Sequence, residues 1–252
     1  MKKILFTISL VLQICFGSLA VKAQATIDLE TGLVFTGYND VRIPGDIGTL
    51  FSFKEDLKSK TEFFYRIRLS YIIKSRHTIS ILYAPLETKS EGNVAYDILF
   101  EGVVFPAQTK ITGIYKFNSY RLTYRYKIVK KPRIEFGLGF TAKIRDAKIA
   151  LSSPGLATEK TNVGFVPIIN FRLLWNMSEK FGLLIDGDAL AAPQGRAEDI
   201  LIALRYKISE SFTTRLGYRI LEGGADNNEV YNFTLFHYAS VGLSYTFKKK
   251  KM

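Results

Sequence analysis

The chain has 252 residues, a formal net charge of +12, two histidines and one cysteine, which is too few for a disulfide framework within the chain. It lacks a Walker loop, a dinucleotide-binding fingerprint, a zinc-ligand spacing and a G-x-S-x-G nucleophile elbow, which argues against the common nucleotide-dependent and serine-hydrolase classes. Beyond the N-terminal segment no run of about 18 apolar residues occurs, so no membrane-spanning helix is expected there.

Residues 1–25 have the three parts of a secretory signal peptide. Two lysines come first, an apolar run covers residues 4–21, and the small-residue pattern Ala23-Gln24-Ala25 follows. We expect cleavage after Ala25, which leaves residues 26–252 as one domain; a retained membrane-anchor helix is the alternative. The cleaved chain would carry 32 basic and 23 acidic side chains, a net charge of +9. A basic exported protein is expected to meet anionic lipid headgroups and not nucleic acid.

From residue 26 onward, apolar and polar side chains alternate in runs long enough for a tilted membrane-spanning strand, which needs about 9 to 11 residues. Phe63, Tyr65 and Ile67, for example, alternate with Arg66 and Arg68. Since successive side chains of a strand point to opposite faces, each run has one apolar and one polar face. We expect ten strands, over residues 27–38, 62–74, 77–86, 110–129, 133–149, 162–176, 181–190, 198–208, 212–222 and 229–247.

The connections between these runs alternate between short and long. Short turns are expected at residues 75–76, 130–132, 177–180 and 209–211. Longer connectors are expected at residues 39–61, 87–109, 150–161, 191–197 and 223–228. This alternation is typical of a membrane β-barrel, whose short turns lie at the periplasmic end and whose longer loops lie outside. The irregular stretch 87–123 leaves eight or twelve strands open, and a water-soluble β-sandwich is the alternative fold.

The last strand ends in a spaced pattern formed by Ser240, Gly242, Tyr245 and Phe247. This pattern resembles the C-terminal targeting strand of bacterial outer-membrane β-barrels. The resemblance implies an all-β, transmembrane, up-and-down antiparallel barrel in the outer membrane of a Gram-negative cell, porin-like in architecture. It also implies outer-membrane lipid and lipopolysaccharide as neighbours, insertion by the barrel-assembly machinery, and a monomer without cofactors. The lysine-rich tail after Phe247 departs from the family, whose targeting strand usually finishes the chain.

On this fold the polar face lines the lumen. Eighteen charged side chains fall there, twelve basic and six acidic. The candidate charge network comprises Arg66, Arg68, Arg121, Arg125, Arg172, Asp186, Asp188, Asp199, Arg205, Arg215 and Arg219, and the remaining seven are Asp28, Glu30, Lys127, Glu135, Lys143, Arg145 and Lys207. We expect arginine–carboxylate pairs to plug this narrow lumen, with Asp186, Asp188 and Asp199 as partners for Arg172, Arg205 and Arg215. The alternative is a narrow path for anionic solutes.

No catalytic residue and no metal ligand is assigned. His237 is the one candidate for the catalytic residue of an outer-leaflet hydrolase, because it is expected on the lipid-facing side of its strand, near the outer membrane interface. Small barrels that deacylate lipid A carry a His-x-Ser pair, but here the matching position is Ala239. A ten-stranded barrel also resembles the omptin proteases, yet no histidine lies in a long loop. The acidic loop 222–229 could hold Ca²⁺, although ordinary turn chemistry explains its glycines and asparagines.

The first long loop is too apolar to be a simple solvated connector. It carries Leu50, Phe51, Phe53 and Leu57. We expect it to fold over the mouth of the barrel or to form a short amphipathic helix against it, with a partner-binding surface as the alternative. Taken together, the sequence predicts a structural or interaction role exerted through the extracellular loops. A narrow anion channel and a lipid A-modifying hydrolase are the alternatives.

Overall fold

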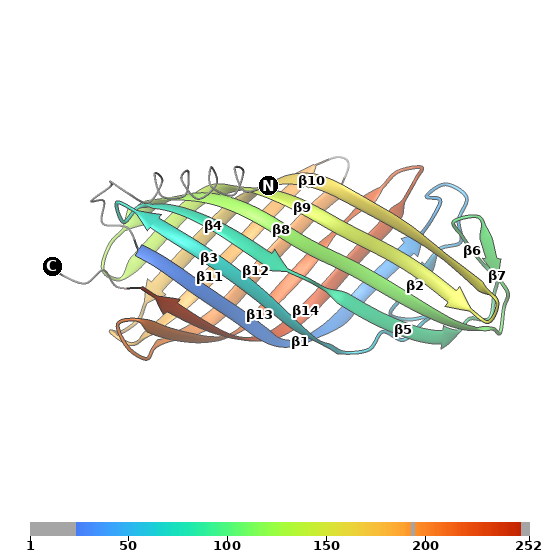
Figure 1. The fold of residues 1–252 in the computed structure, drawn as a ribbon, viewed down its shortest axis with the longest axis horizontal. Coiled ribbons are helices and arrows are strands. Elements are labelled where there is room, and N and C mark those ends of the chain that lie inside the picture. Colours follow the sequence, from blue (N-terminus) through green and yellow to red (C-terminus); the bar gives the residue numbers. More distant parts are fainter. Residues whose placement is uncertain (1–23, 193–194, 248–252) are drawn as a thin grey trace, which may run out of the picture.

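A computed structural model describes residues 24–192 and 195–247 (Figure 1). The predicted signal peptide and the lysine-rich tail lie outside these residues, except that Gln24 and Ala25 begin the first strand. The barrel strands are β1 (Gln24–Arg42), β3 (Glu62–Ile73), β4 (His77–Ala84) with its continuation β5 (Glu87–Asn93), β8 (Lys110–Lys130), β9 (Ile134–Ser153), β10 (Leu156–Asn176), β11 (Phe181–Ala192), β12 (Gly195–Lys207), β13 (Phe212–Asp226) and β14 (Tyr231–Thr246). Three short strands, β2 (Phe51–Ser52), β6 (Ile98–Phe100) and β7 (Val103–Phe105), lie in loops.

The strands close into an antiparallel barrel. Each barrel strand pairs with its neighbours along the chain, and β14 pairs with β1 from Thr26 opposite Thr246 to Arg42 opposite Tyr231. The described residues therefore form ten barrel strands, as predicted, because β4 and β5 both pair with β8 and count as one. Among these residues no helix is long and apolar enough to cross a membrane.

An apolar band surrounds the lower half of the barrel, next to the short turns. On β3 the outward positions run from Phe63, which is 85% exposed, through Leu69 to Ile73, ten residues further along the strand. At about 3.3 Å per residue and a tilt near 40°, such a band is about 25 Å tall, the thickness expected of a membrane-spanning barrel. Trp175 and Phe181 lie on the outer face beside the short turns, as an interfacial aromatic girdle requires. The predicted outward face is thus confirmed.

The predicted long connectors are wrong in four of the five places, because the strands extend further than expected. Between β9 and β10 only two residues, Pro154 and Gly155, remain outside the strands, where a connector over residues 150–161 was expected. Residues 87–93 form β5, and residues 223–226 belong to β13. Connector 191–197 is likewise reduced, because β11 and β12 enter it from both sides. The 21 residues of β10 span about 50 Å along the barrel axis, roughly twice the apolar band.

The alternation of apolar and polar faces inverts above the band. In the upper half the outward side chains are charged, as in the pairs of Lys116 with Asp146 at 2.9 Å and Lys148 with Glu159 at 3.6 Å. The inward side chains there are apolar and buried, as with Leu151, which is 1% exposed. The pattern of outward apolar residues therefore ends near the top of the band, and the strand segments above it have the pattern expected of polar connectors.

Two loops cover the upper end and form a cap, which we define as residues 43–61 and 94–109. The backbone N–H of Thr49 donates to the carbonyl of Leu99 at 2.9 Å, which joins the two loops. In Figure 1 the β6–β7 hairpin of the second loop lies at the end opposite the short turns. Phe53, Phe100 and Phe105 of the cap are fully buried. The prediction that the first long loop folds over the mouth is therefore confirmed.

Replacing Phe53 with alanine should loosen the cap without unfolding the barrel. Phe53 packs edge-on against Tyr115 with ring centroids 6.1 Å apart and is fully buried, so its loss should cost the cap about 3–5 kcal/mol of packing. We expect faster proteolytic cleavage within residues 43–61, while heat-modifiable gel migration shows a folded barrel. Leu50→Ala is the matched control because Leu50 is half exposed. Equal cleavage rates for both variants would contradict a packed cap.

Candidate functional site

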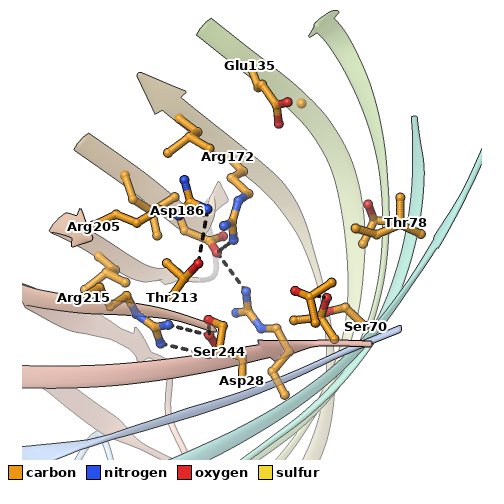
Figure 2. A pocket seen from close by; sticks show the side chains of 18 of the residues that line it. Asp28, Ser70, Thr78, Glu135, Arg172, Asp186, Arg205, Thr213, Arg215 and Ser244 are labelled. Carbon is orange, nitrogen blue, oxygen red and sulfur yellow. Dashed lines mark hydrogen bonds and ion pairs between the residues drawn. The ribbon is translucent and has the colours of Figure 1, made fainter. Parts of the chain in front are cut away.

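A cavity of about 760 Å³ occupies the lower lumen (Figure 2). Its rim contains Gln24 and Thr246 at the ends of the barrel seam and Ser178 in a short turn, so it opens at the short-turn end. Its deepest described lining residues include Arg66 and Arg219. Among the described lining residues nine are basic and six are acidic. The cavity is therefore a polar vestibule with an excess of positive charge.

A balanced layer of ions closes the inner end of the vestibule. This ion layer consists of three arginines and three carboxylates, each at most 5% exposed, which are Glu30, Arg66, Arg121, Asp188, Asp199 and Arg219. They come from six different strands and meet across the lumen. Since every charge in the layer has an opposite partner, the desolvation cost of each ion is offset by close contacts.

Asp199 on β12 is the centre of the ion layer. Its Oδ2 atom accepts from Arg66 Nη2 at 2.9 Å and from Arg121 Nη2 at 2.6 Å, while Oδ1 accepts from Arg219. Arg219 also donates to both oxygens of Glu30, at 2.8 and 2.9 Å. One carboxylate thus joins β3, β8 and β13 through the lumen of the barrel.

Asp188 on β11 is the third carboxylate of the ion layer. Its two oxygens accept from Arg121 Nη1 at 2.6 Å, from Thr141 at 2.7 Å and from Asn170 at 2.9 Å. The hydroxyl and the amide are uncharged donors, so they satisfy the carboxylate without adding charge. Asp188 is therefore fully engaged within the layer.

The predicted pairing is found in part. Arg172 donates to Asp186 at 2.7 Å, as expected. Arg215 instead pairs with Asp28 and Glu30 across the barrel seam, because its side chain points toward β1 and away from β12. The Nη2 atom of Arg205 lies 3.4 Å from the Thr213 hydroxyl, and no ion pair within 4 Å involves Arg205 among the described residues.

The other charged residues predicted to face the lumen also lie on its wall. Arg68 donates to Asp186 at 2.8 Å, and Arg125 donates to the Asn170 amide oxygen at 3.0 Å. Two lysine–glutamate pairs lie near the short-turn opening of the vestibule. The N–O distances are 2.5 Å for Lys127 with Glu135 and 2.6 Å for Lys207 with Glu210. Above the ion layer, Lys143 lies over the ring of Phe117 at 4.7 Å, and Arg145 donates to Asn162 at 2.5 Å.

An apolar layer fills the lumen above the ions. Its strand residues include Phe64 and Tyr238, whose rings meet edge-on at 4.8 Å, and Tyr115 and Phe236, whose centroids are 5.6 Å apart. A void of only about 10 Å³ is found between Phe64, Arg66 and Tyr238, space for about one water molecule. Phe236 and Tyr238, on either side of His237 in the sequence, are both buried inside the barrel.

The cap continues the apolar layer and presents a fixed outer surface. The Tyr96 hydroxyl donates to Asp56 Oδ2 at 3.0 Å and so links the second loop to the first. Burial and this hydrogen bond raise the pKa of Tyr96 to about 12. Ile47 and Val104 remain exposed on the outside of the cap.

His237 lies on the outer face of the barrel, away from the vestibule. Its ring stacks on Phe35 at 5.6 Å and its Nδ1 atom is hydrogen-bonded to the Tyr218 hydroxyl. Ser240 faces the lumen, is fully buried, and donates to the carbonyl of Gly217 at 3.4 Å. The structure therefore does not bring a serine nucleophile to His237.

The glycine of the predicted targeting pattern has a packing role inside the barrel, and its two aromatic residues pack on the outer face. Gly242 of β14 lies beneath the guanidinium of Arg215, and a Cβ atom at this glycine would be 2.4 Å from Arg215 Cζ. The missing side chain lets Arg215 of β13 reach over β14 to Asp28 and Glu30 of β1. At the end of β14, the ring of Tyr245 packs between those of Phe212 and Phe247, each with a centroid distance of 4.8 Å.

Within residues 24–192 and 195–247, no group of three or more His, Cys, Asp or Glu side chains is arranged to hold a metal ion. In the acidic loop 222–229, the Asn227 side chain accepts from the N–H groups of Glu229 and Val230, both at 3.0 Å. Glu222 is held by Arg196 at 2.7 Å. The loop therefore shows turn chemistry, with one of its carboxylates already paired.

Sequence reasoning missed the apolar layer and the second half of the cap. The signal was available: in β8 the inward positions Ile111 and Tyr115 are apolar, while Lys116 faces outward, the reverse of the pattern lower on the same strand. The residues Ile98, Phe100 and Phe105 of the second loop were also not singled out. Three large apolar residues within one connector indicate a packed loop.

A Gly242→Ala substitution should weaken barrel closure. The new methyl group would displace the Arg215 guanidinium from Asp28 and Glu30, which should lower the free energy of unfolding by roughly 1–3 kcal/mol. The measurement is the midpoint of denaturant unfolding of the micelle-bound barrel. In an Arg215→Ala background the same substitution should cost much less, because the two residues share one contact. Additive effects would contradict the seam contact.

An Asp199→Asn substitution should destabilise the barrel more strongly. It removes the charge that faces Arg66, Arg121 and Arg219, and leaving buried charges without their partner typically costs about 3–5 kcal/mol. The midpoint of denaturant unfolding should fall accordingly. Glu135→Gln is the control. The pair of Glu135 with Lys127 is partly solvated at the short-turn opening of the vestibule and should contribute about 0–1 kcal/mol to the free energy of unfolding. Similar losses for both variants would show that the ion layer has no special role.

No protein-family model matches the sequence, and no curated protein matches it in sequence. Among solved structures, the outer-membrane protease OmpT from Escherichia coli is similar at a TM-score of 0.59 and 10% identity, covering 92% of this chain and 99% of OmpT. The attachment invasion locus protein Ail of Yersinia pestis gives 0.41 and 11%, covering 90% and 99%. An outer-membrane channel from Pseudomonas putida F1 gives 0.43 and 10%, covering 91% and 97%. The first likeness supports the fold alone, and the other two are too low to argue from.

Proposed function

We propose that this chain, which has the fold of the small bacterial outer-membrane β-barrels, is a closed barrel that presents its cap to the outside of the cell. The observation that carries this proposal is that two barriers, the ion layer and the apolar layer, lie one above the other in the same lumen. The ion layer lies above the vestibule, and the apolar layer and the cap lie above the ions. A solute entering from the periplasm meets charged pairs first and packed aromatic rings next.

The apolar layer is what distinguishes a closed barrel from a narrow pore. An ion in a pore needs water or polar groups along its whole path, and a layer of packed rings supplies neither. Phe51, Phe53 and Phe100 of the cap pack against one another and against Tyr115 of the wall. Opening the path would require the cap core to separate, with the loss of this buried contact.

The cap supports an interaction role because its two loops are tied to each other and to the wall. Ser59 and Ser90 share a hydrogen bond at 2.7 Å, which joins the first loop to β5. A surface held in one conformation loses little entropy on binding. The exposed Ile47, Leu50 and Val104 give this surface apolar contact points among polar residues.

Within the described residues the two alternative functions are less well supported than a closed barrel. The excess of basic side chains that suggested an anion path ends at the balanced ion layer. The hydrolase hypothesis needs a nucleophile near His237, and its described hydrogen-bond partner is the Tyr218 hydroxyl. The protease likeness is one of fold, because His77 lies at the short-turn end and His237 on the outer face.

In planar lipid bilayers the folded protein should show no stable open level under applied voltage. A variant in which a short Gly-Ser linker replaces residues 95–108 should also remain closed, because the ion layer and the strand-borne part of the apolar layer are retained. Heat-modifiable gel migration shows whether each sample is folded, and an open porin in the same bilayer is the positive control. A steady anion-selective current through the parent protein would overturn the proposal and support the channel.

A further inference from the structure

The charges in the vestibule are not balanced as they are in the ion layer. Beneath that layer Arg68, Arg125 and Arg172 all face one carboxylate, Asp186, at N–O distances of 2.8, 3.7 and 2.7 Å. Asp186 is 4% exposed, and its Oδ1 atom is buried without a hydrogen-bond partner. Three guanidinium groups therefore share a single negative charge.

A fourth guanidinium, that of Arg205, adds to this excess. Arg205 lies on β12 and Arg172 on β10, with Asp186 on the intervening β11, and Figure 2 shows the three side chains gathered on one wall. The only hydrogen bond of Arg205 among the described residues is the long one to Thr213, at 3.4 Å. The next carboxylate on the cavity wall, Glu135, is held by Lys127 at 2.5 Å.

Three arginines around one aspartate, with Arg205 beside Arg172, leave an uncompensated positive charge inside a narrow lumen. Like charges repel more strongly there than in bulk water, because the protein wall lowers the local dielectric constant. The planar fork of an arginine matches the oxygens of a carboxylate or a phosphate and donates two parallel hydrogen bonds to it. The cavity has room for such a group, since about 760 Å³ lies open toward the short-turn end.

We propose that the vestibule binds a small oxyanion, carboxylate or phosphate in type, from the periplasmic side, between Arg125, Arg172 and Arg205. The anion supplies the negative charge that the chain itself does not place there. Asp186 remains the partner of Arg68 and Arg172 and fixes the orientation of the Arg172 fork. The site ends below the ion layer, so it is a blind pocket, and occupancy does not depend on conduction through the barrel.

The test is the thermal unfolding of the folded, detergent-solubilised barrel, followed by heat-modifiable gel migration or by calorimetry. Inorganic phosphate and sodium acetate are each compared with sodium chloride at equal ionic strength. We expect phosphate, acetate or both to raise the unfolding temperature saturably above its value in chloride, and the stronger of the two identifies the type of anion. Equal unfolding temperatures in all three salts would overturn the proposal.

Arg205→Gln should separate a binding role from a structural one. In chloride alone the variant should unfold at the same temperature as the parent or higher, because it relieves repulsion from Arg172. In phosphate or acetate it should lose most of the stabilisation, with at least a tenfold weaker apparent affinity. Lys180→Gln is the matched control: it removes one positive charge from the same end, and Lys180 lies in an exposed turn outside the cavity lining. Equal weakening by both substitutions, or destabilisation of Arg205→Gln in chloride, would overturn the proposal.

Discussion

The contact of Asp199 with three arginines is the interaction on which the rest of this lumen depends. A ten-stranded barrel is too wide for short side chains to meet at its centre, and too narrow to hold charged groups apart from each other. Arginine is long enough to reach the middle from the wall and has donors on several sides. Because Arg66, Arg121 and Arg219 converge on one carboxylate, strands that share no backbone ladder are fixed relative to each other. The vestibule below and the apolar layer above are separated by this contact.

The lower half of the molecule could be predicted from the sequence, because the alternation holds over most of its strands; Leu184 and Leu201, which are apolar, buried and line the cavity, depart from it. Alternation along Glu62–Ile73 placed Phe63 outside and Arg66 inside, and the structure confirms both. The count of ten strands and the direction of their faces followed from that rule, and the resemblance at the level of fold followed from the pattern at the end of the last strand. The inward direction of the candidate arginines was likewise available, since parity fixes the face of each side chain.

The partners of those side chains could not be predicted. The alternation of side chains tells which face of the sheet a residue lies on but not which residues a long side chain contacts. Arg215 extends over the neighbouring strand to Asp28 only because Gly242 has no side chain in the way. Contacts across the lumen, such as Arg66 with Asp199, depend on strand tilt and stagger, which a single sequence does not contain. The upper half does not follow from the alternation of the lower half for a different reason: above the band the apolar side chains face inward and the charged ones face outward.

That reversal means that a single continuous sheet obeys the solubility rules of two different solvents. Below the boundary near Tyr120 a polar replacement on the outer wall would face hydrocarbon, whereas above it, near Lys148, the same replacement would face water. A detergent collar therefore has to cover only the lower part of the cylinder. The exposed upper part is in this respect an ordinary water-soluble β-barrel, built on top of a membrane-embedded one by the same strands.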